Sequence, residues 1–175
     1  PKDVVDDQYL KIGFGEVIDD RSVFIGVLSK VATSKMPRCN LSQVRHFGFA
    51  SILSMGTSLL GWTQSIHQRG LFDSSARVFG LTSEGNEVAW KGYAAVSAAK
   101  VALESLGRSI AVEYGPYGIR CNIIQAGITD TPALRAIPGN EQLVAQARLR
   151  NPGGRLTQPS DVANVIYLLS LDEAA

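Results

Sequence analysis

The sequence predicts an α/β fold built around a parallel sheet, and three observations support that prediction. A short β-prone run at 76–82 is followed by a long helical segment, and a second β-prone run follows at 119–125. A strand, a crossover helix and a second strand form a βαβ unit, which requires a parallel strand pair. The chain has 175 residues, of which 45% are hydrophobic and 17 are glycine, as is typical of a packed domain with many turns.

The elements of this unit follow from the local sequence. The first strand reads ARVFGLT, and the second reads IRCNIIQ. Between them, the Ala- and Leu-rich segment 93–114 is predicted to be a helix that ends at the stop signal Gly115-Pro116. Two further helices are predicted downstream, at 141–150 and at 159–171.

The first 75 residues favour helices. Segment 41–69 has helical spacing of its apolar residues, begins after a capping-box pattern at Asn40 and ends at Gly70. Segment 17–36 is a second helix candidate. We therefore expect one domain over residues 1–175, with a helical region of unassigned role at 1–75 and a catalytic part at 76–175. We also expect the chain to be a fragment of a longer protein.

Composition excludes several classes of function. Seventeen Lys and Arg residues against sixteen Asp and Glu residues leave a net charge of +1, and the basic residues are scattered. This pattern argues against a nucleic-acid-binding surface. No apolar run approaches the roughly 20 residues that a membrane helix needs, so we expect a cytoplasmic protein without a membrane span. The two cysteines, Cys39 and Cys121, are expected to be free thiols, and no metal site is expected.

Four features converge at the carboxyl edge of the predicted sheet, where parallel α/β sheets bind ligands. Ser83 follows the first strand, Tyr93 begins the crossover helix, and loop 126–131 follows the second strand. Lys100 lies seven residues after Tyr93, which places the two within about 20° on one helix face. A phenol, an ammonium group and a hydroxyl are therefore predicted to face one cleft.

These groups suit the stabilisation of a developing oxyanion. A Tyr hydroxyl can donate to an oxygen that becomes negative, and a nearby Lys ammonium eases that donation by stabilising the phenolate. A substrate carbonyl is the natural recipient. Each residue alone has a more ordinary interpretation: Tyr93 as a packed ring, Ser83 as a turn or capping residue, and loop 126–131 as a glycine turn. Their joint placement on one edge favours a site.

The motifs LTSEG, YAAVSAAK, ALESLGRSIAVEYGPYGIRCNII and AGITDTPAL, which lie within 80–171, resemble the short-chain dehydrogenase/reductases. In most of that family a Tyr precedes the Lys by four residues, and a Ser precedes that Tyr by thirteen. Ser83 and Lys100 keep the resulting spacing of seventeen, but Val96 occupies the usual Tyr position. Six residues separate Tyr93 from Lys100, and this spacing resembles the enoyl-acyl-carrier-protein reductase branch.

The resemblance implies a role for each candidate residue. Lys100 would bind the nicotinamide-ribose hydroxyls, Tyr93 would bind the thioester carbonyl oxygen as the enolate forms, and Ser83 would orient the substrate. Segment 133–150 would cover the acyl chain as a lid. The residues that would contact the carboxamide and phosphate side of NADH or NADPH are Gly127, Ile128, Thr129 and Thr131.

The resemblance also implies a Rossmann-like three-layer fold, which is expected to be incomplete in this chain. The Gly-rich phosphate turn has no counterpart, because Gly13-Phe14-Gly15 lacks the third glycine and a preceding strand. The family's last strand would come after Ala175. The family's active-site Asn has no clear counterpart in residues 41–69.

The implied function is NAD(P)H-dependent reduction of an enoyl thioester, as in fatty acid biosynthesis, with acyl carrier protein or coenzyme A as the thioester handle. One alternative is a carbonyl reductase or dehydrogenase of the same family. Another is a non-catalytic fragment that acts as a binding or oligomerisation module. Small residues spread around the helix at 93–114 permit packing on a partner helix or wholly within one subunit, and the family resemblance favours a homodimer or homotetramer.

Overall fold

A parallel sheet of three strands organises the computed structural model, which describes residues 23–25, 51–90, 93–135 and 139–174. The order of the strands within these residues is β1-β2-β3, and both pairings are parallel. The register aligns Val78 with Cys121 and Thr82 with Gln125, so β2 and β3 end side by side. The predicted βαβ unit is confirmed. The strands are β1 (Val23–Ile25), β2 (Arg77–Thr82) and β3 (Arg120–Gln125).

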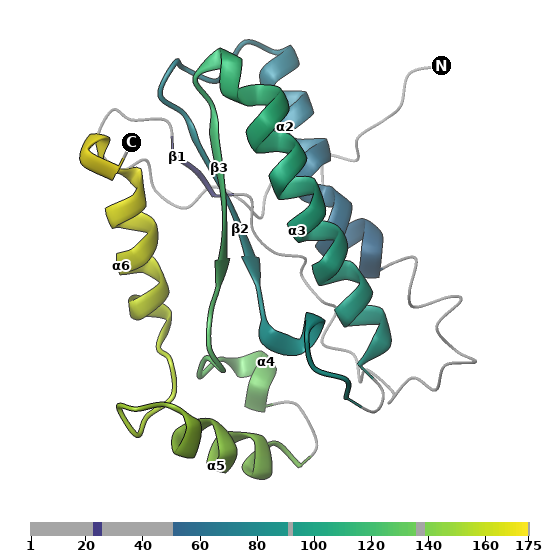
Figure 1. Ribbon diagram of the computed structural model, residues 1–175, viewed down its shortest axis with the longest axis vertical. Coiled ribbons are helices and arrows are strands. Elements are labelled where there is room, and N and C mark those ends of the chain that lie inside the picture. The colour runs from purple at the N-terminus through teal and green to yellow at the C-terminus, as the bar shows by residue number, and fades with distance from the viewer. Residues whose placement is uncertain (1–22, 26–50, 91–92, 136–138, 175) are drawn as a thin grey trace.

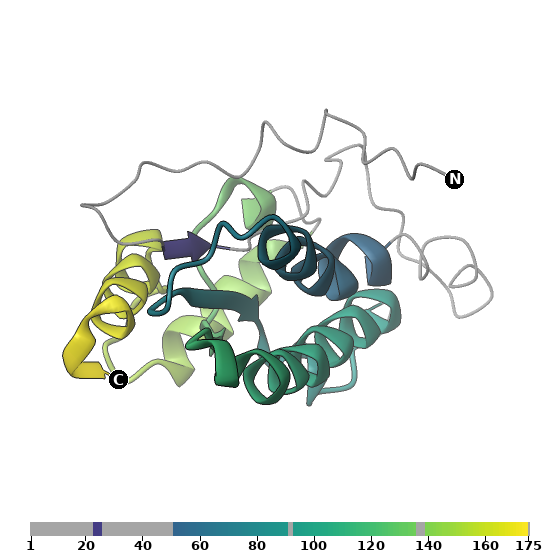
Figure 2. The ribbon, with the colours of Figure 1, turned by 90° about the horizontal axis from the view of Figure 1, so that it is seen from above.

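Helices form a layer on each side of this sheet. The helices α2 and α3 cover one face, and α6 lies on the other (Figures 1 and 2). The helices α4 and α5 lie beyond the carboxyl ends of the strands (Figure 1). The predicted three-layer arrangement is therefore present. The bounds are α2 (Ser58–Gln68), α3 (Ala94–Tyr114), α4 (Pro132–Arg135), α5 (Asn140–Arg150) and α6 (Pro159–Ser170), with short helical turns η3 (Glu84–Asn86), η4 (Gly115–Tyr117) and η5 (Asp172–Ala174).

The core lies between the sheet and the pair α2 and α3. A Cβ atom added to Gly107 of α3 would lie 2.5 Å from Cδ1 of Ile123 on β3, so the glycine lets the helix approach the strand closely. This close approach fixes the height of α3 above the sheet, and with it the height of any catalytic residue on α3. The buried core residues are Leu59, Ala76, Val78, Leu103, Ile110 and Ile119.

The prediction of a helix at 17–36 is wrong at 23–25, where the chain forms β1. This strand also corrects the expectation that residues 1–75 form a helical region. Val23, Phe24 and Ile25 pair in parallel with the first half of β2. Their side chains favour extended backbone, and a short apolar run has no periodicity that separates a strand from a helix. The rest of 17–36 lies outside the described residues.

The prediction of a helix at 41–69 is confirmed over its described part, with one correction. Residues Ile52–Thr57 form a π-helical turn, η2, before the regular helix α2 begins. Hydroxyls at the end of this turn and at the start of α2 donate to backbone carbonyls in the turn, as in the bonds from Thr57 to Leu53 and from Ser58 to Ser54. Such local bonds compete with regular helical pairing. Gly70, with φ +65°, follows the helix as predicted.

Two cysteines and one glycine pair were singled out in the sequence. Cys121 is a free thiol, as expected. Cys39 and the Gly13-Phe14-Gly15 segment lie outside the described residues. No helix in the described part of the chain is long and apolar enough to cross a membrane.

Candidate active site

Ser83 and Tyr93 meet at the carboxyl end of β2. Ser83 follows the strand directly in extended conformation and begins the turn η3. The Ser83 Oγ atom lies 3.4 Å from the Tyr93 hydroxyl oxygen, and either hydroxyl can be the donor. Both side chains are half-buried. The structure thus joins two of the three predicted catalytic residues through their reactive atoms.

Tyr93 is the N-cap residue of α3, and packing holds its ring in one position. A Cβ atom added to Gly85 would overlap the ring, so only glycine permits this placement. On another side Trp90 packs edge-on, with 5.2 Å between the ring centroids. The hydroxyl is therefore aimed by packing of the ring as well as by its contact with Ser83.

Lys100 lies on α3 below this pair and binds the strand that leads to Ser83. Its Nζ atom donates a 2.7 Å hydrogen bond to the carbonyl oxygen of Leu81. Burial lowers the pKa of Lys100, and the charge of Glu104 opposes that shift. Among the described residues no hydrogen bond joins Lys100 to Tyr93. The residue is at the predicted edge, and its ammonium group binds the backbone of β2.

Glu104 binds the residues before and after Ser83. Its Oε1 atom accepts a 2.5 Å bond from Thr82 Oγ1 and a 2.6 Å bond from Asn86 Nδ2. These two residues flank the segment that contains Ser83. Because both bonds are made to a carboxylate, they belong to the stronger class of hydrogen bonds.

Loop 126–131, which carries the predicted cofactor-binding residues, is tied to the segment after α5. Thr129 and Thr157 form an isolated parallel bridge, with a 3.1 Å bond from Thr157 N to the carbonyl oxygen of Ile128. A Cβ atom on Gly127 would lie 2.7 Å from Thr157 Oγ1, so this glycine admits the threonine. Thr129 Oγ1 donates to the Gly127 carbonyl within the loop, and Thr131 Oγ1 accepts from Leu134 N at 3.2 Å.

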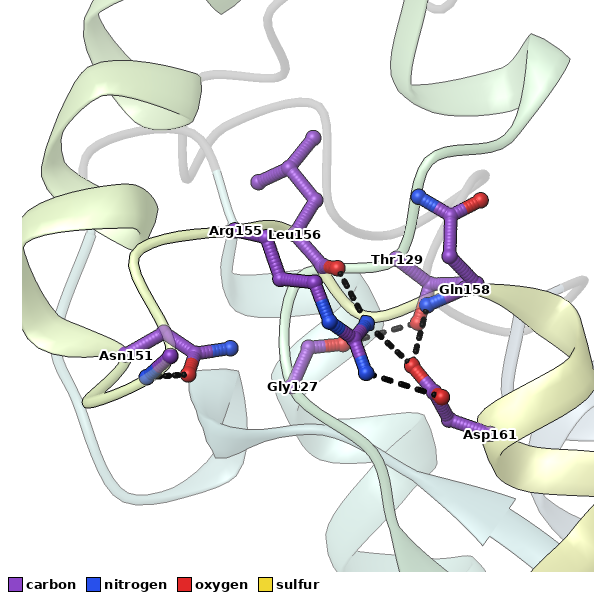
Figure 3. Close-up of polar contacts among 8 residues, drawn as sticks. Gly127, Thr129, Asn151, Arg155, Leu156, Gln158 and Asp161 are labelled. Carbon is purple, nitrogen blue, oxygen red and sulfur yellow. Dashed lines mark hydrogen bonds and ion pairs between the residues drawn. The ribbon is translucent and has the colours of Figure 1, made fainter.

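An ion pair anchors the other side of that bridge, as Figure 3 shows. The Arg155 guanidinium binds both carboxylate oxygens of Asp161 at 2.6 and 3.0 Å and also donates to the Leu156 carbonyl oxygen. The hydrogen bond from Arg155, with a second from the Gln158 backbone, lowers the pKa of Asp161 to about 2. Both partners of the ion pair reach solvent. The start of α6 and the loop 126–131 are thereby joined.

A cavity of about 420 Å³ lies between these parts. Glu84, which follows Ser83, and Trp90, which packs on Tyr93, line one side. Leu143, Ala147 and Arg150 of α5 line the other. Gly127 and Ile128, two of the predicted cofactor-binding residues, belong to the same lining. The cavity therefore borders loop 126–131 and the neighbours of the Ser83–Tyr93 pair, but Ser83, Tyr93 and Lys100 themselves are not part of its lining.

The family model described as Enoyl-(Acyl carrier protein) reductase matches residues 1–175, the whole of this chain. The chain belongs to the short-chain dehydrogenase/reductase family. The solved structure of Enoyl-[acyl-carrier-protein] reductase (NADH) from Aquifex aeolicus VF5 is similar to this chain, with a TM-score of 0.69 and 24% identity. The likeness covers 87% of this chain and 59% of that one, and at this identity it supports the fold.

Two curated dehydrogenases are also similar to this short-chain dehydrogenase/reductase. It is 40% identical over 79 residues to cis-4-hydroxycyclohexanecarboxylate dehydrogenase of Sinomonas cyclohexanicum, which covers 45% of this chain and 31% of that protein. It is 35% identical over 92 residues to 2,3-dihydro-2,3-dihydroxybenzoate dehydrogenase of Escherichia coli (strain K12), which covers 48% of this chain and 37% of that protein. The match thus spans about a third of the length of each relative.

Sequence reasoning missed three groups in this short-chain dehydrogenase/reductase site. Glu104 had a signal, because it lies one helical turn after Lys100 on a helix that was predicted correctly. The pair of Arg155 and Asp161 had a weaker sequence signal, since an acidic residue in the first turn favours a helix start. The ion pair between Glu84 and Arg150 had no sequence signal, because its partners are 66 positions apart along the chain.

Proposed function

We propose that this short-chain dehydrogenase/reductase reduces the carbon–carbon double bond of an enoyl thioester with NADH or NADPH. One observation supports the proposal above all: the hydroxyls of Ser83 and Tyr93 lie 3.4 Å apart at the carboxyl edge of the sheet. Lys100 is on the same face of α3 as Tyr93. The position of Tyr93, one turn before the usual family position at Val96, favours enoyl over carbonyl reduction.

The described residues fit the ribose and one phosphate oxygen of a nicotinamide cofactor, whereas the Gly-rich turn for its pyrophosphate has no counterpart in this sequence. A Lys ammonium has three N–H donors, and among the described residues Lys100 uses one of them, on the Leu81 carbonyl. Two donors remain for ribose hydroxyls. The Thr131 hydroxyl accepts from Leu134 and keeps its own proton for a phosphate oxygen. The Thr129 proton is already donated to Gly127, so Thr129 fits a phosphate less well than Thr131 does.

A bound reduced nicotinamide would supply a hydride for the β-carbon of the enoyl group, and a proton from water, taken up at the α-carbon, would complete the reduction. Tyr93 donates a hydrogen bond to the thioester oxygen, which becomes an enolate oxygen as the β-carbon is reduced. The Lys100 ammonium, held at Leu81, contributes positive charge beneath that oxygen. Ser83 orients the carbonyl through its contact with the Tyr93 hydroxyl. The packed Tyr93 ring needs little reorganisation, which is the basis of such catalysis.

The cavity beside this pair suits an acyl chain. Its lining combines apolar side chains such as Trp90, Ile128 and Leu143 with the charged side chains of Arg150 and Arg155. Acyl carrier protein or coenzyme A, both acidic, is the proposed thioester handle. We also propose a homodimer or homotetramer, because Val101 and Val112 of α3 are 50% and 77% exposed. A cytoplasmic location belongs to the same proposal.

Reduction of a carbonyl, or oxidation of an alcohol, is the second candidate function. The contact between Ser83 and Tyr93 fits this reaction as well as the first, because two converging hydroxyls can bind one carbonyl or alcohol oxygen. The two curated relatives are both named as dehydrogenases of ring carboxylic acids. In the reduction Tyr93 protonates the alkoxide that forms, and in the oxidation it takes the proton of the alcohol.

Assays with an enoyl thioester and a 3-ketoacyl thioester separate the two candidates. Tyr93→Phe keeps the ring and deletes the donor, so we expect the preferred activity to fall by about 10²- to 10³-fold. Tyr117→Phe, on an exposed ring beyond the other end of α3, is the control and keeps full activity. Reduction of the ketone alone would replace the enoyl proposal with the carbonyl one. No turnover of either substrate would favour a non-catalytic binding module.

A double variant tests the Tyr position itself. Adding Val96→Tyr to Tyr93→Phe places a phenol three residues along the helix, about 4.5 Å further on. We expect this variant not to recover enoyl reduction. Recovery of enoyl reduction would contradict the argument from the position of Tyr93.

A further inference from the structure

We propose that Glu104 is a positioning residue for the candidate catalytic pair, because its carboxylate clamps the turn that carries Ser83. The proposal rests on the proposed function and deepens it. The helix α3 then has two roles. It carries Tyr93 and Lys100, and through Glu104 it also holds Ser83, the residue that contacts Tyr93, in position.

Helical geometry places Glu104 on the catalytic face. At 100° per residue, Lys100 lies about 20° to one side of Tyr93, and Glu104 lies about 20° to the other. The three side chains therefore form one line along α3. Tyr93 contacts Ser83 itself, and Lys100 binds the strand two residues before it. Glu104 binds the residues that flank Ser83.

The two bonds of Glu104 span the turn. Thr82, which is 6% exposed, is the last residue of β2, and Asn86 is the last residue of η3. Both bonds converge on the same carboxylate oxygen. A single charged atom thus sets the distance between the end of the strand and the end of the turn, and Ser83 lies between them.

The Asn86 amide depends on this carboxylate. Its Oδ1 atom is buried and has no hydrogen-bond partner among the described residues. Its Nδ2 atom is held by Glu104. A buried amide with an unpaired oxygen is costly, so without the carboxylate the amide gains by turning out towards water, and the turn moves with it.

Glu104 also acts on its neighbour one turn earlier. Lys100 is four residues away on the same face, the spacing at which opposite charges interact on a helix. The charge of Glu104 raises the pKa of Lys100 against the effect of burial. The carboxylate therefore supports both members that contact the strand end: Ser83 by position and Lys100 by charge.

The test compares three substitutions with a matched control. Glu104→Gln keeps an acceptor oxygen, Glu104→Leu removes it, and Thr82→Val removes one donor while keeping its shape. Glu113→Leu changes an exposed acid on the same helix and is the control. Circular dichroism identifies the variants that fold, and Thr82→Val keeps the test available if Glu104→Leu does not fold.

The first measurement is amide hydrogen exchange in the turn. Glu87 N and Val88 N donate to the Glu84 carbonyl oxygen at 3.0 and 3.2 Å, so their exchange reports the turn directly. We expect exchange at these amides to accelerate by about tenfold or more in Glu104→Leu and Thr82→Val, less in Glu104→Gln, and not in Glu113→Leu. Unchanged exchange in Glu104→Leu and Thr82→Val overturns the clamp.

The second measurement is the NMR signal of ¹³Cζ-labelled tyrosine, assigned by its loss in Tyr93→Phe. If the clamp positions the pair, the Tyr93 signal moves in Glu104→Leu and Thr82→Val, and kcat falls about tenfold to a hundredfold. A faster-exchanging turn with an unmoved Tyr93 signal makes Glu104 a purely structural residue and overturns the proposal. The amide exchange and the NMR signal need no bound cofactor, whereas failure of the proposed function appears separately as full activity of Tyr93→Phe.

Discussion

Arg150, the last residue of α5, forms a two-pronged ion pair with Glu84, the residue after Ser83. The Nη1–Oε1 distance is 3.0 Å, and the Nη2–Oε2 distance is 2.8 Å. Both residues of the pair line the cavity. This ion pair therefore joins α5 to the turn that carries Ser83.

Arg150→Met is expected to loosen α5 and to raise the KM for the acyl substrate more than it lowers kcat. The Arg150 side chain is 67% exposed and that of Glu84 is 25% exposed, so the pair contributes only about 0–1 kcal/mol to the free energy of unfolding. Added salt should weaken substrate binding in the native protein and have less effect in the variant. Steady-state kinetics at low and high salt measure both effects.

Arg148→Met is the matched control for this prediction, because Arg148 lies on the same helix, is exposed and does not line the cavity. It should leave KM unchanged. Equal effects of the two substitutions would mean that the charge of α5, and not the ion pair, controls binding.

Gly85→Ala is expected to abolish activity while the fold is retained. The added methyl group overlaps the Tyr93 ring, so the ring must leave its seat and its hydroxyl must leave Ser83. Overpacking of this kind costs about 1–3 kcal/mol of stability. Thermal unfolding and turnover, measured on one preparation, separate the two effects.

Gly61→Ala provides the contrast. A Cβ atom at this position in α2 meets nothing within 4 Å. The substitution should therefore stabilise the helix by about 0.5–1 kcal/mol and leave activity intact. If both alanine variants lose activity alike, the seat of Tyr93 is not the cause.

Cys121 should react slowly with thiol reagents at neutral pH. Burial raises the pKa of its thiol from the ordinary value of 9.0 to about 11, and the thiolate is the reactive form. The folded state holds this proton more tightly than the unfolded state does. The protonated thiol therefore makes its full contribution to the free energy of unfolding below pH 9, and that contribution is lost as the pH rises towards 11. Thiol titration measures the reactivity of Cys121, and denaturant unfolding across this pH range measures the change in stability, with Cys121→Ser as the comparison. A rapidly reacting Cys121 at neutral pH would contradict the prediction.

The sequence was sufficient for the βαβ unit because its helix is long and its stop signal at Gly115-Pro116 is strong. The placement of Ser83 and Tyr93 at one edge of the sheet then follows from topology, since a parallel strand and its crossover helix share that edge. β1 was not predicted, because its three residues are identified as a strand only by their pairing with β2.

Side-chain partners were less predictable than backbone elements. The spacing of Tyr93 and Lys100 predicted a shared helix face, but not that Lys100 would bind the Leu81 carbonyl. That bond depends on how closely α3 approaches β2. Likewise, the contact of Arg150 with Glu84 depends on the path of the whole segment after β3. Such contacts arise from tertiary packing, which local patterns do not encode.

The bridge between Thr129 and Thr157 closes the chain from β3 to α6 into a loop whose two ends touch. The helices α4 and α5 lie entirely within it. An insert with joined ends can change in length or sequence while its attachment points keep their spacing. Under the proposed function, substrate preference is therefore free to differ among related proteins through changes in segment 129–157, while Ser83, Tyr93 and Lys100 keep their positions.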